Sequence, residues 1–314
     1  MKQVLVSLLA MASLHIAAFS VTSAQAQPTR VFVAAQGTDT NPCTFALPCR
    51  SFQRAHDVLA SGGEIDVLDP AGYGALNITK AISIQGHGFA GISVGFGGRA
   101  IQINATETDA VSLNGLLIEG NGIGQYGVIF TTANSLVVNN CVVRNFTAHG
   151  LVAVSNAVSA TQWLGVSNSI LDNNLYGILL GTNSSGPLMA TVDRSQMRGN
   201  GYGFYAFGSN GTGELDAAIT DSVAANNSNG VYVESSTTHS VVNVFLTRVN
   251  VSGNRNGMVA TGANANFRLA QSAVTGSSML GFNIVNGAVG SSFGDNYIRA
   301  NAGNSGSLGT IAKR

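Results

Sequence analysis

Short apolar runs in the second half of the chain recur behind a regularly spaced glycine. The recurring glycines are Gly127, Gly150, Gly177, Gly203, Gly230, Gly257 and Gly281. Their separations are 23, 27, 26, 27, 27 and 24 residues. Positions one and three after each glycine are apolar, which is the period of two that a β-strand shows. A repeat of this length with strand-like periodicity predicts a β-solenoid.

One repeat contains three strand-like segments separated by turns. In the repeat that begins at Gly230, these segments are residues 231–234, 241–246 and 249–252. Because the strands recur in one direction, successive coils stack as three parallel sheets with strands about 4.8 Å apart. The sequence therefore predicts an all-β chain forming a three-sheet parallel β-helix. Leucine-rich repeats share the period, but their recurring Leu and Asn frame is absent.

Polar residues recur at the turns in two columns. The first column, just before the glycine, is Asn145, Asn173, Asn200, Asn226 and Asn254. The second, between the second and third strands, is Asn140, Asn168, Arg194, Asp221, Arg248, Gln271 and Asp295. Asn tolerates the left-handed backbone and bonds to neighbouring backbone groups. We therefore expect sharp turns at both columns, with stacked Asn side chains bonding to each other.

The segment before the repeats predicts a cover for the N-terminal mouth of the solenoid. Residues 51–60 have an N-cap at Ser51 and one apolar helical face, formed by Phe52, Ala55, Val58 and Leu59. We expect an N-terminal strand, a Cys-containing loop and this capping helix in residues 27–63, and the β-helix in residues 64–314. Residues 301–309 are rich in Gly, Ser and Asn, which fits either a frayed end or a partner contact.

The first residues predict export. Lys2 precedes an apolar stretch over residues 4–18, and Ala24-Gln25-Ala26 supplies the small residues that a signal peptidase requires. The apolar stretch is shorter than the roughly 20 residues of a membrane-spanning helix. We therefore expect a signal peptide in residues 1–26, cleaved after Ala26. The mature protein is then secreted or periplasmic, without membrane insertion.

Two cysteines lie close together in a loop bounded by prolines. Cys43 and Cys49 are separated by five residues, and in an exported protein this favours a local disulfide. A metal or redox pair is the alternative, although the spacing differs from that of zinc sites. Cys141 lies in an apolar segment and is predicted to be buried.

Composition narrows the range of partners. Charged residues make up 10% of the chain, with 15 Lys and Arg against 15 Asp and Glu. Such a surface provides no field that attracts nucleic acid. The carboxylates are scattered along the sequence, so we expect no metal site, and no motif indicates a cofactor. The sequence does not indicate an oligomeric state.

Several segments before the repeats resemble the entry coil of one superfamily. They are Gly37-Thr38-Asp39-Thr40-Asn41-Pro42, Pro48-Cys49-Arg50-Ser51-Phe52, Gly62-Gly63-Glu64-Ile65 and Ile78-Thr79-Lys80-Ala81-Ile82-Ser83-Ile84-Gln85-Gly86. Together with the later N-x-x-G-[VIF] coils, they resemble pectate-lyase-like right-handed β-helix proteins over most of the mature chain. The resemblance implies a right-handed coil. Because the superfamily includes lyases, hydrolases, epimerases, tailspikes and proteins without assigned activity, it does not imply one reaction.

Two sequence features bear on whether the protein is an enzyme. Gly86-His87-Gly88 is similar to a polygalacturonase motif, but the paired Asp residues of that family are absent, so we interpret it as a turn. A charged column recurs near the end of the third strand: Glu119, Arg144, Asp172 and Arg198. Its alternating signs predict an ion-pair ladder. The alternative is a catalytic flank formed by Arg144, Asp172, Arg198 and His149.

An aromatic column is the most suggestive surface feature. The position before the recurring glycine holds Tyr126, His149, Tyr176 and Tyr202, and two residues after it come Tyr205 and Tyr232. In the superfamily the first sheet and its turns often form the substrate groove. The resemblance therefore implies a glycan-binding strip, in which ring faces stack on sugars. The alternative is that these rings only cover the face of the sheet.

Two functional hypotheses follow. The first is an exported, non-catalytic β-helix that binds a glycan or belongs to the cell surface or envelope. The second is a carbohydrate-active enzyme, either a polysaccharide lyase or a hydrolase. A polysaccharide is the expected partner in both cases. The absence of a recognisable catalytic cluster favours the first, whereas carboxylates converging within roughly 5–9 Å would favour the second.

Overall fold

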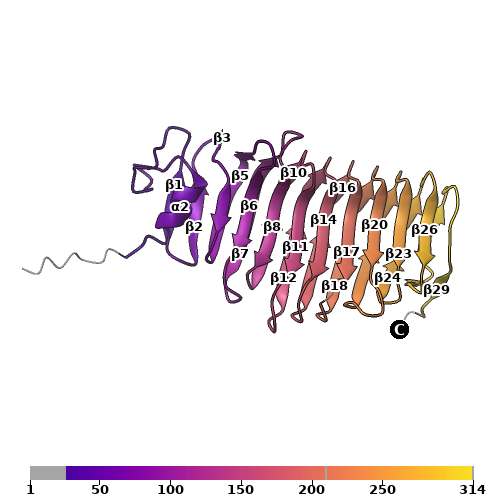
Figure 1. Cartoon of the computed structure of the whole chain (residues 1–314). Coiled ribbons are helices and arrows are strands. Elements are labelled where there is room, and N and C mark those ends of the chain that lie inside the picture. The colour runs from indigo at the N-terminus through magenta and orange to yellow at the C-terminus, as the bar shows by residue number, and fades with distance from the viewer. Residues whose placement is uncertain (1–25, 209–210, 313–314) are drawn as a thin grey trace, which may run out of the picture.

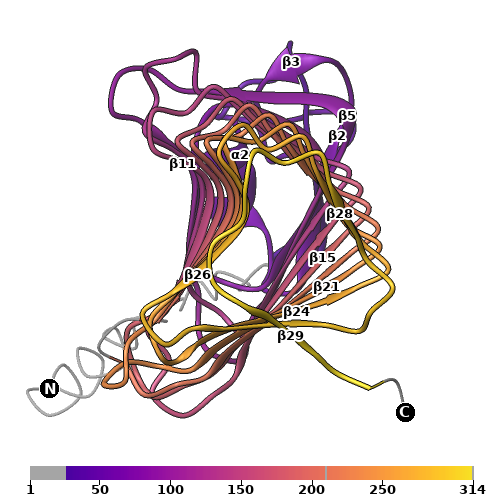
Figure 2. The same cartoon turned by 90° about the vertical axis from the view of Figure 1, so that its right-hand side faces the viewer.

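Parallel strands of successive coils lie side by side along an elongated solenoid (Figure 1). The computed structural model describes residues 26–208 and 211–312. Viewed from its end, the solenoid has three walls (Figure 2), and the side chains between them form the buried core. Within the described residues, the chain is a right-handed parallel β-helix with one short helix, as the sequence predicts.

The first wall is a nine-stranded parallel sheet. Its strands are β4 (Leu76–Ile78), β6 (Arg99–Asn104), β8 (Tyr126–Thr132), β11 (His149–Ser155), β14 (Tyr176–Thr182), β17 (Tyr202–Gly208), β20 (Asn229–Glu234), β23 (Asn256–Thr261) and β26 (Leu280–Val285). Each of these strands begins a new coil. This wall therefore carries the recurring glycine and the aromatic column of the sequence.

The second and third walls are joined. The second contains β1 (Arg30–Val33), β2 (Gly63–Val67), β9 (Ser135–Asn139), β12 (Gln162–Ser167), β15 (Leu188–Asp193), β18 (Leu215–Thr220), β21 (Val242–Thr247), β24 (Ala265–Ala270), β27 (Val289–Ser292) and β29 (Leu308–Thr310). The third contains β3 (Ala71–Gly72), β10 (Val142–Arg144), β13 (Ile170–Asp172), β16 (Gln196–Arg198), β19 (Val223–Ala225), β22 (Asn250–Ser252), β25 (Ala273–Thr275) and β28 (Tyr297–Arg299). The long strands β5 (Ile82–Ser93) and β7 (Ala110–Glu119) run through both walls, so these walls form one 20-stranded sheet.

Strand register confirms the predicted repeat. Pairing of β8 with β11 aligns Tyr126 with His149, which places Gly127 beside Gly150 despite the short 23-residue interval. The same alignment continues through every later coil to β26. Residues one and three after the glycine are buried in the core, as Leu151 and Ala153 show at 0% exposure, with the single exception of the partly buried Phe282 in the described residues. Stacking of these inward positions makes one continuous core.

The first asparagine column of the sequence is two columns in the structure. Left-handed turn positions hold Asn145, Asn173 and Asn226. Asn200 and Asn254 instead align with Asn174 and Asn227 in a buried row. In this row, the Asn200 Oδ1 accepts hydrogen bonds from the backbone and side-chain amides of Asn174, at 2.9 and 3.2 Å. The sequence alignment merged the two columns because they are adjacent in the chain.

The second polar column occupies the left-handed turns that it predicts. Six members have φ between 44° and 54°: Asn140, Asn168, Arg194, Asp221, Arg248 and Gln271. Asp295 departs from the pattern because the left-handed residue there is Gly294, with φ at 80°. The Asp295 carboxylate instead accepts a hydrogen bond from the Gln271 backbone amide at 3.1 Å.

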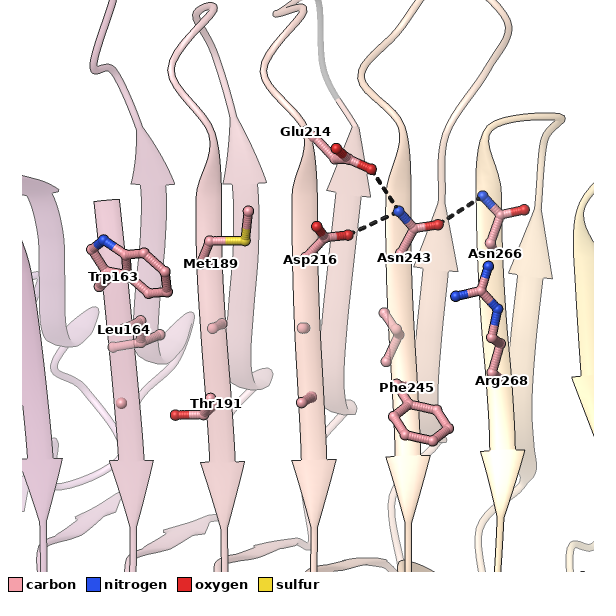
Figure 3. Close-up of a pocket in the computed structure, with 15 residues that line it drawn as sticks. Trp163, Leu164, Met189, Thr191, Glu214, Asp216, Asn243, Phe245, Asn266 and Arg268 are labelled. Carbon is pink, nitrogen blue, oxygen red and sulfur yellow. Dashed lines mark hydrogen bonds between the residues drawn. The ribbon is translucent and has the colours of Figure 1, made fainter. Parts of the chain in front are cut away.

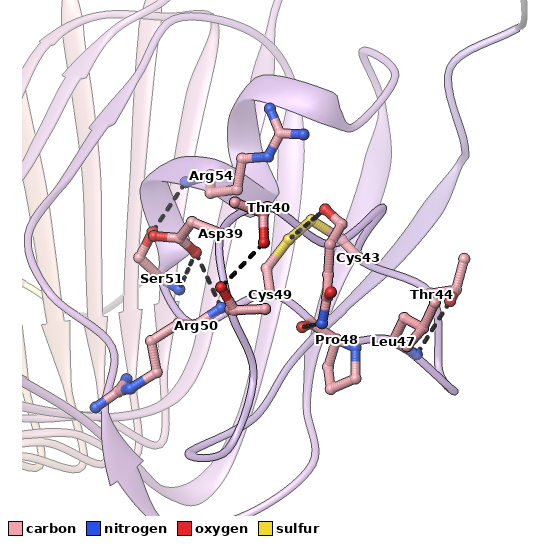
Figure 4. The surroundings of a disulfide bond; sticks show 12 residues. Asp39, Thr40, Cys43, Thr44, Leu47, Pro48, Cys49, Arg50, Ser51 and Arg54 are labelled. Atoms are coloured by element: carbon pink, nitrogen blue, oxygen red, sulfur yellow. Dashed lines mark hydrogen bonds between the residues drawn. A yellow bond between two sulfur atoms is a disulfide. The ribbon is translucent and has the colours of Figure 1, made fainter.

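The N-terminal mouth is covered by helix α2 (Phe52–Val58). The Ser51 side chain accepts a hydrogen bond from the backbone amide of Arg54, which confirms the predicted N-cap. The preceding loop carries the Cys43–Cys49 disulfide, also as predicted (Figure 4). Asp39 fastens this loop to the helix, because its carboxylate accepts hydrogen bonds from both Arg50 and Ser51. Cys141 is free and buried, and burial raises the pKa of its thiol to about 11.

The expected signal peptide, residues 1–26, lies outside the described residues except for Ala26. In the described part of the chain, no helix has the length and apolarity to span a membrane. At the other end, Ser305 bridges to Asn283, and β29 pairs with β27. This pairing contradicts a frayed end for residues 305–310, whereas a partner contact stays a prediction.

Candidate functional site

The aromatic column forms a stack of rings on the first wall. Parallel pairing places Tyr126, His149, Tyr176 and Tyr202 in one row at the start of four strands. Ring centroids are 5.1, 4.9 and 4.9 Å apart, with interplanar angles of 2°, 10° and 10°. The ring spacing matches the distance between parallel strands, so each inner ring presents both faces to its neighbours.

Tyr205 and Tyr232 extend this stack on the same wall. Their centroids are 5.2 Å apart, and Tyr205 also lies 5.5 Å from Tyr176. The Tyr205 hydroxyl donates to Glu234 Oε2 at 2.7 Å, and burial, followed by this hydrogen bond, raises the pKa of the phenol. All six aromatic side chains are half-buried. A sugar would therefore meet mainly ring edges, and the strip stays a prediction.

The charged column lies on the third wall and forms two separate ion pairs, rather than the continuous ladder that its alternating signs predict. Arg144 Nε is 2.7 Å from Glu119 Oε2, and Arg198 Nε is 3.7 Å from Asp172 Oδ2. Arg144 and Asp172 are paired in register. Partial burial of Glu119 is outweighed by hydrogen bonds from Asn145 and Arg144, which lower the pKa of its carboxyl. The four charged side chains are thus accounted for by two ion pairs.

His149, the fourth catalytic candidate, belongs to a different wall. It lines a hollow of about 410 Å³ together with Arg99, Tyr126 and apolar residues such as Val152 and Leu179. Arg144, Asp172 and Arg198 belong to β10, β13 and β16 instead. A catalytic role for these four residues stays a prediction.

The Gly86-His87-Gly88 segment forms a turn within β5. His87 and Gly88 have φ of 56° and 84°, and the strand register shifts between Gln85 and Ala90. The His87 Nε2 lies 2.7 Å from Asp66 Oδ1. The interpretation of this segment as a turn is therefore confirmed.

A larger groove, which the sequence did not predict, lies on the outer face of the second wall (Figure 3). It encloses about 720 Å³. One outward row consists of Trp163, Met189, Asp216, Asn243 and Asn266. The next outward row consists of Gly165, Thr191, Ala218, Phe245 and Arg268. The small residues Gly165, Thr191 and Ala218 of the second row produce the depression. The larger side chains Trp163 and Phe245 lie on either side of it.

Two carboxylates converge on one amide in this groove. Asn243 Nδ2 donates to Glu214 Oε1 at 2.9 Å and to Asp216 Oδ1 at 2.8 Å. The two accepting oxygens are therefore separated by no more than the sum of these distances, about 5.7 Å. Asn266 Nδ2 in turn donates to Asn243 Oδ1 at 3.2 Å. Figure 3 shows Glu214 and Asp216 both directed toward Asn243.

Aromatic side chains stand at intervals along the same groove. Trp163 is 54% exposed and Phe245 is 38% exposed, so both contact solvent. Three strand spacings separate them, which is about 14 Å at the usual distance between parallel strands. Unlike the stacked rings of the first wall, Trp163 has no aromatic neighbour among the ring pairs of the described residues. Its exposed indole is therefore available to a ligand.

The sequence contained a signal for this groove. Trp163 and Asp216 fall at outward positions of second-strand segments, and both align with Asn243 in the strand register. Alignment on the glycine alone does not identify this row, because loops of different length separate the first and second strands. Within the described residues, no group of three or more His, Cys, Asp and Glu side chains is arranged to hold a metal ion.

Comparison with known proteins identifies the fold and nothing finer. No protein-family model and no curated protein matches the chain. The crystal structure of pectate lyase Pel9A is similar with a TM-score of 0.52 and 16% identity, over 90% of this chain and 78% of that one. ORF18 of Geobacillus virus E2 is similar with a TM-score of 0.53 and 14% identity, over 81% of this chain. The match covers 53% of ORF18, about half its length. The fold is therefore that of pectate-lyase-like parallel β-helix proteins.

Proposed function

We propose that the protein is an exported, non-catalytic β-helix that binds a glycan in the groove of the second wall. The observation that carries this proposal is the combination of an exposed Trp163 with the planar polar groups of Asp216 and Asn243 in one row. An indole face packs on the apolar face of a sugar ring, and carboxylates and amides bond to its hydroxyls. Similarity in fold to a pectate lyase supports a carbohydrate ligand.

The dimensions of the groove suit an extended ligand. It crosses β12, β15, β18, β21 and β24. Four steps of about 4.8 Å between parallel strands give a length of about 19 Å, the reach of a few sugar units. Its lining is mixed, with apolar side chains beside amides and carboxylates, as is usual for pockets that bind small polar molecules.

Substitutions in the groove test this proposal. Binding of purified protein to an array of neutral and acidic oligosaccharides, followed by calorimetry on the positive members, measures affinity. Trp163→Ala and Asn243→Ala should each weaken binding at least about tenfold, with little change in thermal stability. Tyr297→Ala is the matched control, because Tyr297 is 59% exposed but lies outside the groove. Full affinity in both groove variants would refute the site.

The predicted aromatic strip is a competing site that the same assay resolves. Tyr176→Ala removes a ring whose faces pack against His149 and Tyr202. If those rings serve packing, this variant loses stability and keeps its affinity for the glycan. A loss of affinity with unchanged stability would instead place the glycan on the strip.

One specific observation supports the alternative hypothesis that the protein is an enzyme. The accepting oxygens of Glu214 and Asp216 lie no more than about 5.7 Å apart, and this upper limit admits the separation of about 5–5.5 Å found in retaining glycosidases. However, the Asn243 side-chain amide donates to both carboxylates and holds them together, which favours a binding role. Release of reducing ends or unsaturated products by the wild type, and its loss in Glu214→Gln, would establish catalysis instead.

Export belongs to the proposal. The Cys43–Cys49 disulfide is compatible with an oxidising compartment such as the periplasm or the cell exterior. The apolar segment before Ala26 would act as the signal peptide that directs export. N-terminal sequencing of protein recovered from those compartments should start at Gln27. Recovery of only the uncleaved chain from the cytoplasm would contradict export.

A further inference from the structure

The middle of the groove carries two carboxylates that form no ion pair within the described residues. Among the ion pairs of the described residues, none includes Glu214 or Asp216. Their hydrogen-bond donor in the groove, the Asn243 amide, is neutral. Arg268 lines the groove but forms no ion pair with either carboxylate. Two anionic groups therefore face any ligand that crosses β18.

This charge bears on which glycans the groove accepts. Polyuronates carry one carboxylate on each sugar, so an extended chain in the groove would bring several anions near Glu214 and Asp216. Repulsion between like charges a few ångströms apart is strong where solvent is partly displaced. Hydroxyl groups, by contrast, donate hydrogen bonds to carboxylates. The same two side chains thus attract an uncharged glycan and repel an acidic one.

We infer that Glu214 and Asp216 are specificity-determining residues that make the groove select uncharged glycans and reject polyuronates. The inference rests on the proposed function, since it concerns the ligand of the same groove. The inferred ligand class differs from that of the protein with the similar fold, because pectate lyase is named for an acidic polysaccharide. Electrostatic complementarity of this kind sets specificity more than it sets affinity.

The test compares neutral oligosaccharides with carboxylated ones. Cellohexaose, xylohexaose and a β-1,4-galactan hexamer are the neutral probes, and hexamers of galacturonate and mannuronate are the acidic probes. Calorimetry in low-salt buffer gives the affinity for each. We expect the wild type to bind at least one neutral hexamer at least about tenfold more tightly than either uronate. The double variant Glu214→Gln/Asp216→Asn should bring this ratio close to one.

A charge-matched variant controls for the net charge of the molecule. Glu107→Gln/Asp221→Asn removes two exposed carboxylates outside the groove. Asn at position 221 tolerates its left-handed backbone, where φ is 47°. This control should keep the wild-type preference. Circular dichroism and thermal unfolding verify that all variants are folded.

Each outcome decides a different statement. Tighter binding of a uronate by the wild type would overturn the selectivity while leaving glycan binding in place. An equal change of the ratio in the control variant would also overturn it, because the effect would then belong to net charge. Failure to bind any hexamer, neutral or acidic, would overturn the glycan-binding proposal and the inference with it.

Discussion

At the residue scale, His149 is the side chain whose surroundings most change its chemistry. Its ring lies between Tyr126 and Tyr176, at centroid distances of 5.1 and 4.9 Å. The Nδ1 is buried without a hydrogen-bond partner in the described residues. Burial lowers the pKa of the imidazole from 6.5 to about 4. The folded protein therefore keeps this ring neutral at a pH where an exposed histidine is half protonated.

Acidification should destabilise the protein through His149. Because its pKa is lower in the folded than in the unfolded chain, the unfolded chain takes up the proton first as the pH falls. Stabilisation by the neutral ring is complete above about pH 6.5 and is lost progressively toward pH 4. We expect a loss of about 1–2 kcal/mol, since solvent and cation–π attraction to the tyrosines offset part of the burial cost.

The variant His149→Phe isolates this effect, because it preserves the stack and removes the titrating group. Urea unfolding at pH 7 and pH 4.5 gives the free energy of unfolding of both proteins. The variant should lose less stability than the wild type between these two pH values. Parallel losses in the two proteins would show that other groups are responsible.

At the scale of the element, the turn into each first-wall strand from β8 onward depends on close approach between coils. A Cβ added at Gly177 would lie 2.6 Å from the carbonyl oxygen of Gly203 and 3.0 Å from the side-chain amide of Asn200. That amide donates to the carbonyl of Leu171, so it is held in place. The recurring glycine and the buried asparagine row are thus two parts of one turn structure.

Gly177→Ala should therefore lower the free energy of unfolding by about 2–3 kcal/mol, the upper part of the range of about 1–3 kcal/mol that is typical for an added methyl group in a tightly packed site. Gly165→Ala is the matched control. Gly165 also lies within a strand, but a Cβ there would be 3.8 Å from its nearest neighbour. The control should be neutral or slightly stabilising, because alanine orders the strand at lower entropic cost. Equal losses in the two variants, measured by urea unfolding, would contradict the steric explanation.

At the scale of the whole molecule, internal coils and end coils differ in their support. Strands such as β14 pair with β11 on one side and β17 on the other. At the C-terminal end, β28 pairs with β25, and β29 pairs with β27. In a solenoid, stability is close to a sum over neighbouring repeats, so coils with one neighbour open first.

Hydrogen exchange should report this gradient along the axis. Backbone amides of β14 and β17 should exchange at least about tenfold more slowly than those of β28 and β29, because opening an internal coil breaks two interfaces. Mass spectrometry of peptides from the exchanged protein measures the rates coil by coil. Uniform protection from β8 to β29 would show instead that the solenoid opens as a single cooperative unit.

The sequence by itself determined the solenoid and its register. A two-residue alternation indicates which side chains face the core, and a glycine that recurs once per coil aligns the coils. These signals are local or strictly periodic, so they survive without coordinates. The disulfide and the N-cap at Ser51 were also local, since each depends on residues a few positions apart.

The tertiary structure decided what the outer surface offers. The aromatic row was correctly aligned by sequence, but only the coordinates show that its ring faces are occupied by each other. Glu214 and Asp216 converge on Asn243 across nearly thirty residues, and loops of unequal length set that alignment. A groove depends on the sizes of side chains summed over several coils. Such a sum exists only once every coil has been placed beside its neighbour.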